Sequence, residues 1–266
     1  MSAEGLAGLK ASISDARDLF RKLDEREWDE QSAATGWSVR SVGLHLGDLL
    51  AVLMSAVRGE LTTDLGIERL NDQHVAEKSD RSVAWIRDEF ERQSVAALEV
   101  FEGLQNEPYA STEVPYLDLG TYPLHTMPDL CAFDFYTHLR WDVLAPRGPL
   151  RRMLPEPDAV RLNPAVAWLL QGLPRMQPGL LDHLNQPLEL VLTGPAGGKW
   201  TLYPGQKAIE VLPADVTAPT GAVAQVQSTT HLFTAWATTR LPWRDQVTVS
   251  GDALAAARFL DALNLV

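Results

Sequence analysis

Apolar side chains recur at helical spacing in four long stretches of the first half of the chain. The stretches lie at residues 4–23, 39–58, 78–104 and 124–144. In each, apolar residues return every three or four positions among charged ones, as in an amphipathic helix. Polar residues dominate the connection at 59–77, and prolines interrupt the one at 105–123. We expect an all-α four-helix bundle, because each helix must bury its apolar face against the others.

A proline-rich segment at 145–158 separates this half from one with a different pattern. Its prolines prevent regular structure, as in linkers between domains. Beyond it, alternating or β-branched runs predict strands at 188–193, 199–203, 208–212 and 246–250. Helical spacing returns at 159–172, 176–184, 228–240 and 252–263. We therefore expect a helical domain over 1–148 and an α+β domain with an antiparallel sheet over 158–266.

Charge and cysteine content narrow the classes of function. The chain carries 35 acidic and 23 basic residues, a net charge of −12, and no basic run, which argues against binding to nucleic acid or to anionic membranes. Its first residues show no basic region followed by a long apolar run, and no unbroken apolar run reaches membrane-spanning length, so we expect neither a signal peptide nor a membrane span. The single cysteine, Cys131, excludes an internal disulfide framework and a multi-cysteine zinc site. We expect a soluble, cytoplasmic protein, as a monomer or a homodimer.

Three polar residues share one flank of the helix expected at 124–144. Asp134, His138 and Asp142 follow one another at a spacing of four, so they lie one above the other along the helix. A carboxylate and an imidazole one turn apart can bind a single divalent metal ion. Such pairs are also common on solvated helix faces, so this pair alone identifies no site.

His45 lies on the apolar face of the helix expected at 39–58, between Val42 and Leu49. It has two interpretations. It is either a neutral core histidine held by a hydrogen bond, or a metal ligand pointing into the bundle, where facing helices build such sites. Together with Asp134 and His138 it would make a set of two histidines and one carboxylate. Three protein ligands leave one coordination position open, as in catalytic zinc sites.

Two motifs resemble those of the mycothiol-dependent maleylpyruvate isomerase family, one of the DinB-like metal-binding bundles. GWSVRSVGLHL at 36–46 resembles the family signature that ends in a histidine and a leucine, and HLRWD at 138–142 resembles the end of the family's last bundle helix. In the second half, GKW at 198–200 and VSGD at 249–252 resemble the sterol-carrier-like domain that follows this bundle. The resemblance implies a DinB-like bundle followed by a sterol-carrier-like domain.

The resemblance also implies the chemistry. The family's metal triad falls on His45, Asp134 and His138 and would hold a divalent metal ion, zinc by preference; Asp134 departs from the family's usual glutamate. The cofactor would be mycothiol or a similar low-molecular-weight thiol, which adds to a small electrophilic substrate. In the named isomerase, addition to a cis double bond, rotation and elimination give the trans product. Arg240 is then a candidate for holding a substrate carboxylate, or else a surface arginine.

Two classes of function stay open. The first is a metal-dependent enzyme with a small thiol as cofactor, either maleylpyruvate isomerase-like or a thiol transferase. The second is a non-catalytic ligand- or lipid-binding protein with a degenerate metal site. We interpret Cys131 as a buried, inert thiol and Trp37 as a packing anchor at the start of its helix.

Overall fold

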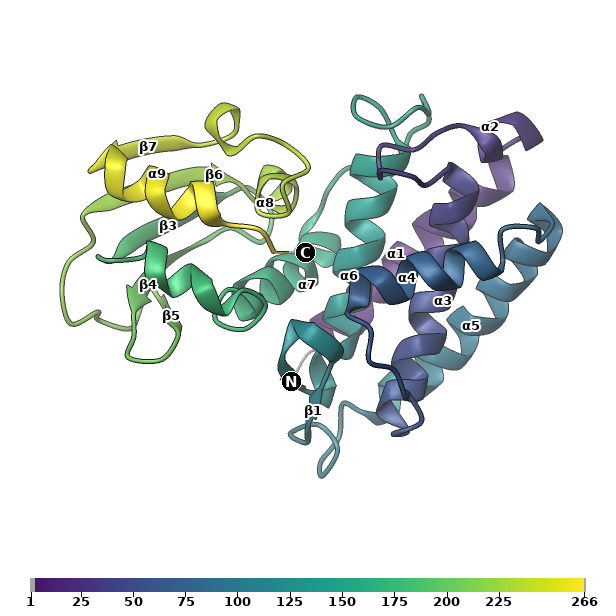
Figure 1. Ribbon diagram of the computed structural model, residues 1–266, viewed down its shortest axis with the longest axis horizontal. Coiled ribbons are helices and arrows are strands. Elements are labelled where there is room, and N and C mark those ends of the chain that lie inside the picture. The colour runs from purple at the N-terminus through teal and green to yellow at the C-terminus, as the bar shows by residue number, and fades with distance from the viewer. Residues whose placement is uncertain (1–2, 266) are drawn as a thin grey trace. The chain divides into compact units, whose positions relative to one another are not determined.

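The computed structural model describes residues 3–265, and the chain divides between Glu156 and Pro157 into two compact units (Figure 1). The helices of the first unit are α1 (Ala3–Lys22), α2 (Glu25–Asp29), α3 (Val39–Val57), α4 (Ile67–Glu77), α5 (Val83–Gly103) and α6 (Met127–Thr137). Of the long helices, α3 packs mainly on α5, and α1 packs mainly on α6. Smaller contacts of α1 with α5 and of α3 with α6 close the ring. The predicted four-helix bundle is confirmed.

Helix α3 is the central helix of this bundle. It begins after Ser38, whose side chain caps the helix by accepting from the backbone N–H of Ser41. Its length and mean hydropathy would suit a membrane span, but 72% of its most apolar window is buried inside the bundle. An apolar helix that is covered on most sides is typical of a protein core.

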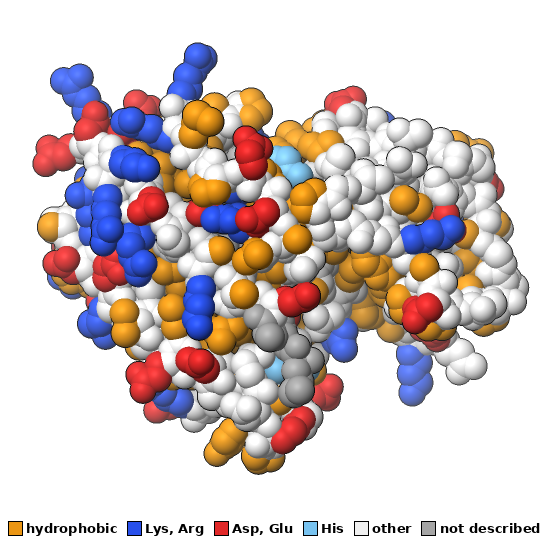
Figure 2. All heavy atoms as spheres, turned by 180° about the vertical axis from the view of Figure 1, so that it is seen from behind, with side chains coloured by type: hydrophobic (Ala, Val, Ile, Leu, Met, Phe, Trp, Pro, Cys, Tyr) orange, Lys and Arg blue, Asp and Glu red, His pale blue; other side chains and the backbone are white. Residues whose placement is uncertain are grey.

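On the face drawn in Figure 2, acidic side chains lie among the basic ones.

Residues 59–77 were predicted to be a polar connection without a helix. This prediction was wrong, because the segment contains helix α4. The residue before α4 is Gly66, which has no side chain to cap it. Instead, a carboxylate oxygen of Asp118 accepts from the backbone N–H of Ile67 at 2.9 Å. Because the cap comes from a distant segment, it leaves no start signal beside the helix. The connection at 105–123 also has structure, a hairpin of β1 (Glu113–Pro115) and β2 (Thr121–Pro123).

The last bundle helix changes its winding where the candidate metal residues lie. α6 is regular only to Thr137, and residues His138–Val143 form a π-helical turn. The hydroxyl of Thr137 donates to the carbonyl groups of Phe133 and Asp134, both at 3.0 Å. Side-chain bonds of this kind compete with the regular helical pattern. Short π-helical turns inside helices are frequent at functional sites.

The second unit is α+β, as predicted. Its strands are β3 (Leu188–Thr193), β4 (Gly198–Pro204), β5 (Ile209–Pro213), β6 (Ala224–Thr229) and β7 (Thr248–Gly251). They form one sheet in the order β5-β4-β3-β6-β7. All neighbouring pairs are antiparallel except β3 and β6, which are parallel. The helices are α7 (Ala159–Gly172), α8 (Thr230–Trp236) and α9 (Ala253–Ala262), with a 3₁₀ helix at Pro178–His183.

Strand β6 lies inside the sheet, yet its sequence did not predict it. Its buried positions are Ala224, Val226 and Ser228, so two of the three carry small side chains and the alternation is weak.

The interior between the sheet and helices α8 and α9 is closely packed. It encloses an apolar cavity of about 10 Å³, lined by residues that include Leu190 and Phe259. A space of this size holds at most one water molecule.

Two glycines of α3 give a matched test of how closely the helices pack. A Cβ atom at Gly43 would lie 2.6 Å from the buried ring of Trp28, whereas one at Gly47 would lie 3.6 Å from Phe90 Cα. We expect Gly47→Ala to raise the free energy of unfolding by about 0.5–1 kcal/mol through helix propensity. Gly43→Ala should lower it by about 1–2 kcal/mol, because overpacking outweighs that gain.

The measurement is urea unfolding of the metal-free protein, followed by far-ultraviolet circular dichroism. Both substitutions add one methyl group to the same helix, so their difference isolates the contact with Trp28. Equal midpoints for the two variants would show that Trp28 yields without cost.

Candidate metal centre

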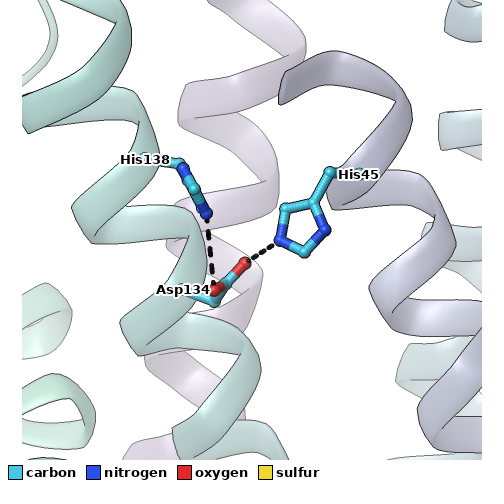
Figure 3. Close-up of side chains that lie close together, drawn as sticks. All are labelled: His45, Asp134 and His138. Atoms are coloured by element: carbon cyan, nitrogen blue, oxygen red, sulfur yellow. Dashed lines mark hydrogen bonds and ion pairs between the residues drawn. The ribbon is translucent and has the colours of Figure 1, made fainter. Parts of the chain in front are cut away.

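Three potential metal ligands converge inside the bundle (Figure 3). His45 projects from the middle of α3, Asp134 from α6, and His138 from the first residue of the π-helical turn. One ligand atom from each side chain lies within 4.8 Å of the other two. The structure therefore brings together the three residues that the sequence predicted as a set. Their binding of a metal ion stays a prediction.

The carboxylate of Asp134 lies between the two imidazoles. Its Oδ2 is 2.8 Å from Nε2 of His45, and its Oδ1 is 3.7 Å from Nε2 of His138 (Figure 3). Ligand atoms on a tetrahedral zinc ion lie about 3.3 Å apart, as follows from zinc–ligand distances of about 2.0–2.1 Å. The two separations run to different oxygens of the carboxylate. With one ligand atom taken from each residue, all three atoms lie within 4.8 Å of one another, so the donor set fits a divalent ion once the side chains move closer together. Nε2 of His45 is also close enough to Oδ2 of Asp134 for the two atoms to share a hydrogen bond.

The second nitrogen of His138 faces another carboxylate. Nδ1 of His138 lies 2.9 Å from Oδ2 of Asp142, although the two are not aligned as a hydrogen bond. Asp142 is buried, and its Oδ1 also contacts the guanidinium of Arg147. Metal-binding histidines commonly turn their second nitrogen toward a carboxylate, which sets the orientation of the ring. Asp142 is placed to do this for His138.

An aromatic ring covers the two imidazoles. The ring centroid of Trp37 lies 4.9 Å from that of His45 and 5.8 Å from that of His138, and its plane is 20° from that of the His138 ring. The two imidazole rings are themselves 4.9 Å apart at an angle of 70°. The sequence interpretation of Trp37 as a packing anchor missed this contact with both histidines. Only its place in the GWSVRSVGLHL motif pointed to it.

Two weakly acidic groups lie in the same region. Burial raises the pKa of the Cys131 thiol well above its usual value, and the carboxylates of Asp134 and Asp129 raise it further. Burial likewise raises the pKa of the Tyr116 phenol, with smaller contributions from Cys131 and Asp134. Within residues 3–265 the Tyr116 hydroxyl has no hydrogen-bond partner. Both groups are therefore neutral at pH 7.

Arg240 belongs to the second unit and follows the end of α8. Its side chain is half-buried, and its backbone N–H donates to the carbonyl of Ala235 at 2.9 Å. The proposed role of Arg240 in holding a substrate carboxylate stays a prediction.

Comparison with protein families identifies the bundle. Residues 9–139 match the family described as the mycothiol maleylpyruvate isomerase N-terminal domain. The bundle belongs to this family. The matched segment includes His45, Asp134 and His138, and the resemblance seen in the sequence motifs is confirmed.

Solved structures extend the likeness to the whole maleylpyruvate isomerase fold. A crystal structure of the mycothiol-dependent maleylpyruvate isomerase aligns with a TM-score of 0.59 at 20% identity, covering 93% of this chain and 92% of that one. A mutant of that isomerase aligns over the same shares with a TM-score of 0.57, also at 20% identity. Comparison with curated protein sequences gives no match. At this identity the structures establish the fold of both units.

The burial of Cys131 and the raised pKa of its thiol predict how the protein reacts with thiol reagents. Because burial keeps the thiol protonated and inaccessible, the native protein should react with Ellman's reagent at pH 8 at least about 100-fold more slowly than a free cysteine. In denaturant, one thiol per chain should react at the ordinary rate. A fast reaction of the native protein would show that Cys131 is reachable as a nucleophile.

Proposed function

We propose that the protein is a metal-dependent enzyme that uses a low-molecular-weight thiol, mycothiol or a similar compound, as its cofactor. The reaction is the isomerisation of a small electrophile, as in maleylpyruvate isomerase, or transfer of the thiol to it. The observation that carries the proposal is the convergence of His45, Asp134 and His138 inside a bundle of this family. Fold alone would not suffice, because one fold hosts many reactions.

His45, Asp134 and His138 would hold the ion, which we propose is zinc, and leave a position open for the thiol. When bound, such an ion strongly favours the thiolate form of a coordinated thiol at neutral pH. His45 is 2% exposed and the side chain of Asp134 is 17% exposed, so Asp134 forms the more open side of the site. Asp142 would keep the ring of His138 turned so that Nε2 faces the ion.

The chain offers no nucleophilic thiol of its own for this chemistry. Its single cysteine, Cys131, is buried, and the raised pKa of its side chain keeps it protonated. A thiol that enters from solution supplies the missing nucleophile. We further propose that Arg240 pairs with a carboxylate of the substrate, since a guanidinium can donate two parallel hydrogen bonds to it. The cytoplasm is the compartment we propose, where thiols stay reduced.

The alternative of a lipid carrier finds less support. A carrier needs an apolar cavity large enough for its ligand, and ligand pockets commonly measure about 300–1,000 Å³. The apolar cavity between the sheet and helices α8 and α9 has a volume of about 10 Å³. Lipid binding there would require the helices to separate from the sheet.

Metal analysis of the purified protein tests the proposal most directly. We expect about one zinc ion per chain in the wild type, as in a site with three protein ligands. His45→Ala and His138→Ala should each lose the ion. Thiol-dependent turnover of maleylpyruvate should also fall by more than about 100-fold, beyond the effect of changing an outer partner of a ligand. His183→Ala, an exposed histidine of the second unit, is the control and should keep both metal and turnover.

Two results would contradict the assignment. The first is a wild-type protein that stays metal-free after reconstitution with zinc. The second is a folded His138→Ala variant that retains a full complement of zinc, which would place the ion elsewhere.

A further inference from the structure

Trp37 contacts both proposed histidine ligands and lies outside the ligand set itself. The ring of His45 is flanked by the indole of Trp37 and the imidazole of His138, each with its centroid 4.9 Å away. The indole is also nearly parallel to the His138 ring, at 20°. One side chain thus restrains two imidazoles that come from two different helices.

The indole is held in place by a carboxylate from another helix. Nε1 of Trp37 donates to Oδ1 of Asp72 at 2.9 Å, and Asp72 lies on α4. Both ends of α4 are tied to the bundle. At its start Ile67 donates to Asp118, and just past its end Lys78 pairs with the buried Asp48 of α3 at 2.5 Å. The helix that carries this carboxylate is therefore fixed at both ends.

An imidazole can turn about its Cβ–Cγ bond, and this torsion has broad minima. A ring that is free to turn spends part of its time with Nε2 directed away from the ion. The apparent affinity for the ion then falls in proportion to the fraction of time in which both rings face it. His138 has Asp142 near its second nitrogen, and the Trp37 indole packs beside the rings of both histidines.

We propose that Trp37, tethered by Asp72, is a positioning residue that keeps Nε2 of His45 and of His138 turned toward Asp134. This inference rests on the proposed function, because it assigns a role to residues around the proposed metal site. It adds a contribution from α4, a helix that supplies none of the three proposed ligands.

The experiment measures the dissociation constant of zinc in the full-length protein by competition with a chromophoric chelator. Trp37→Phe keeps an aromatic ring but removes the N–H donor, and Asp72→Ala removes the acceptor. We expect each to weaken zinc binding by about 10-fold, within the range seen when outer partners of a ligand are changed. The double variant should show no larger shift than Trp37→Phe alone, because Asp72→Ala removes nothing further once the N–H donor is gone.

Two controls separate positioning from general destabilisation. Asp72→Asn keeps an oxygen that can accept from the indole, so its zinc affinity should match the wild type. Trp243→Phe removes an equivalent bond in the second unit, from Trp243 Nε1 to Asp261 at 2.9 Å, and should also leave zinc affinity unchanged. The visible absorption of bound cobalt(II) gives an independent readout, which should change in Trp37→Phe, in Asp72→Ala and in their double variant, but in neither control.

Each outcome decides the matter. Asp72 is exposed, so Asp72→Ala should fold even if Trp37→Phe does not. Wild-type zinc affinity in Asp72→Ala, or shifts that multiply in the double variant, would overturn the inference while leaving the proposed function intact. Failure of the proposed function is distinct, because the wild-type protein would then bind no zinc at all and both proposals would fall.

Discussion

The hydrogen bond between the side chains of His45 and Asp134 links α3 to α6 across the interior of the bundle. A polar group in such a place is tolerated only if it has a partner, because leaving it unpaired would cost about 1–3 kcal/mol. The surrounding structure meets this constraint in layers. Asp134 satisfies His45, Asp142 lies beside His138, and Arg147 neutralises Asp142. The pairing of His45 with Asp134 depends on the register of α3 against α6, and α3 is also held by its close packing on α5.

That packing explains why the polar cluster stays ordered inside an apolar core. Gly43 leaves room for the ring of Trp28, and Gly47 lets the backbone of α5 approach at Phe90. With α3 held from this side, the imidazole of His45 on its other flank has little freedom to move away from α6. The neutral thiol of Cys131 and the neutral phenol of Tyr116 add no competing charge. Of Cys131, Tyr116 and Asp134, only Asp134 therefore has a side chain that can balance the charge of a cation between the helices.

The sequence predicted what local periodicity encodes and missed what distant segments supply. The four long helices, the α+β character of the second unit and the grouping of His45 with Asp134 and His138 follow from spacing and from short motifs. Helix α4 did not, because its cap is Asp118, far away in the chain. Strand β6 did not, because small residues such as Ala224 and Ser228 blur its alternation. The contact of Trp37 with Asp72 depends on α4 lying beside the start of α3, and the sequence did not predict α4, so neither residue alone signals the contact.

The apolar character of α3 has a consequence for the life of the chain in the cell. A helix with the hydropathy of a membrane span is harmless while covered, but an opened bundle would expose it as a surface prone to self-association. A ligand that bridges α3 and α6 binds the closed bundle and not the opened one. By mass action, a higher concentration of that ligand lowers the fraction of molecules in which the bundle is open. The side chains proposed to hold the metal ion would therefore also protect the chain from aggregation.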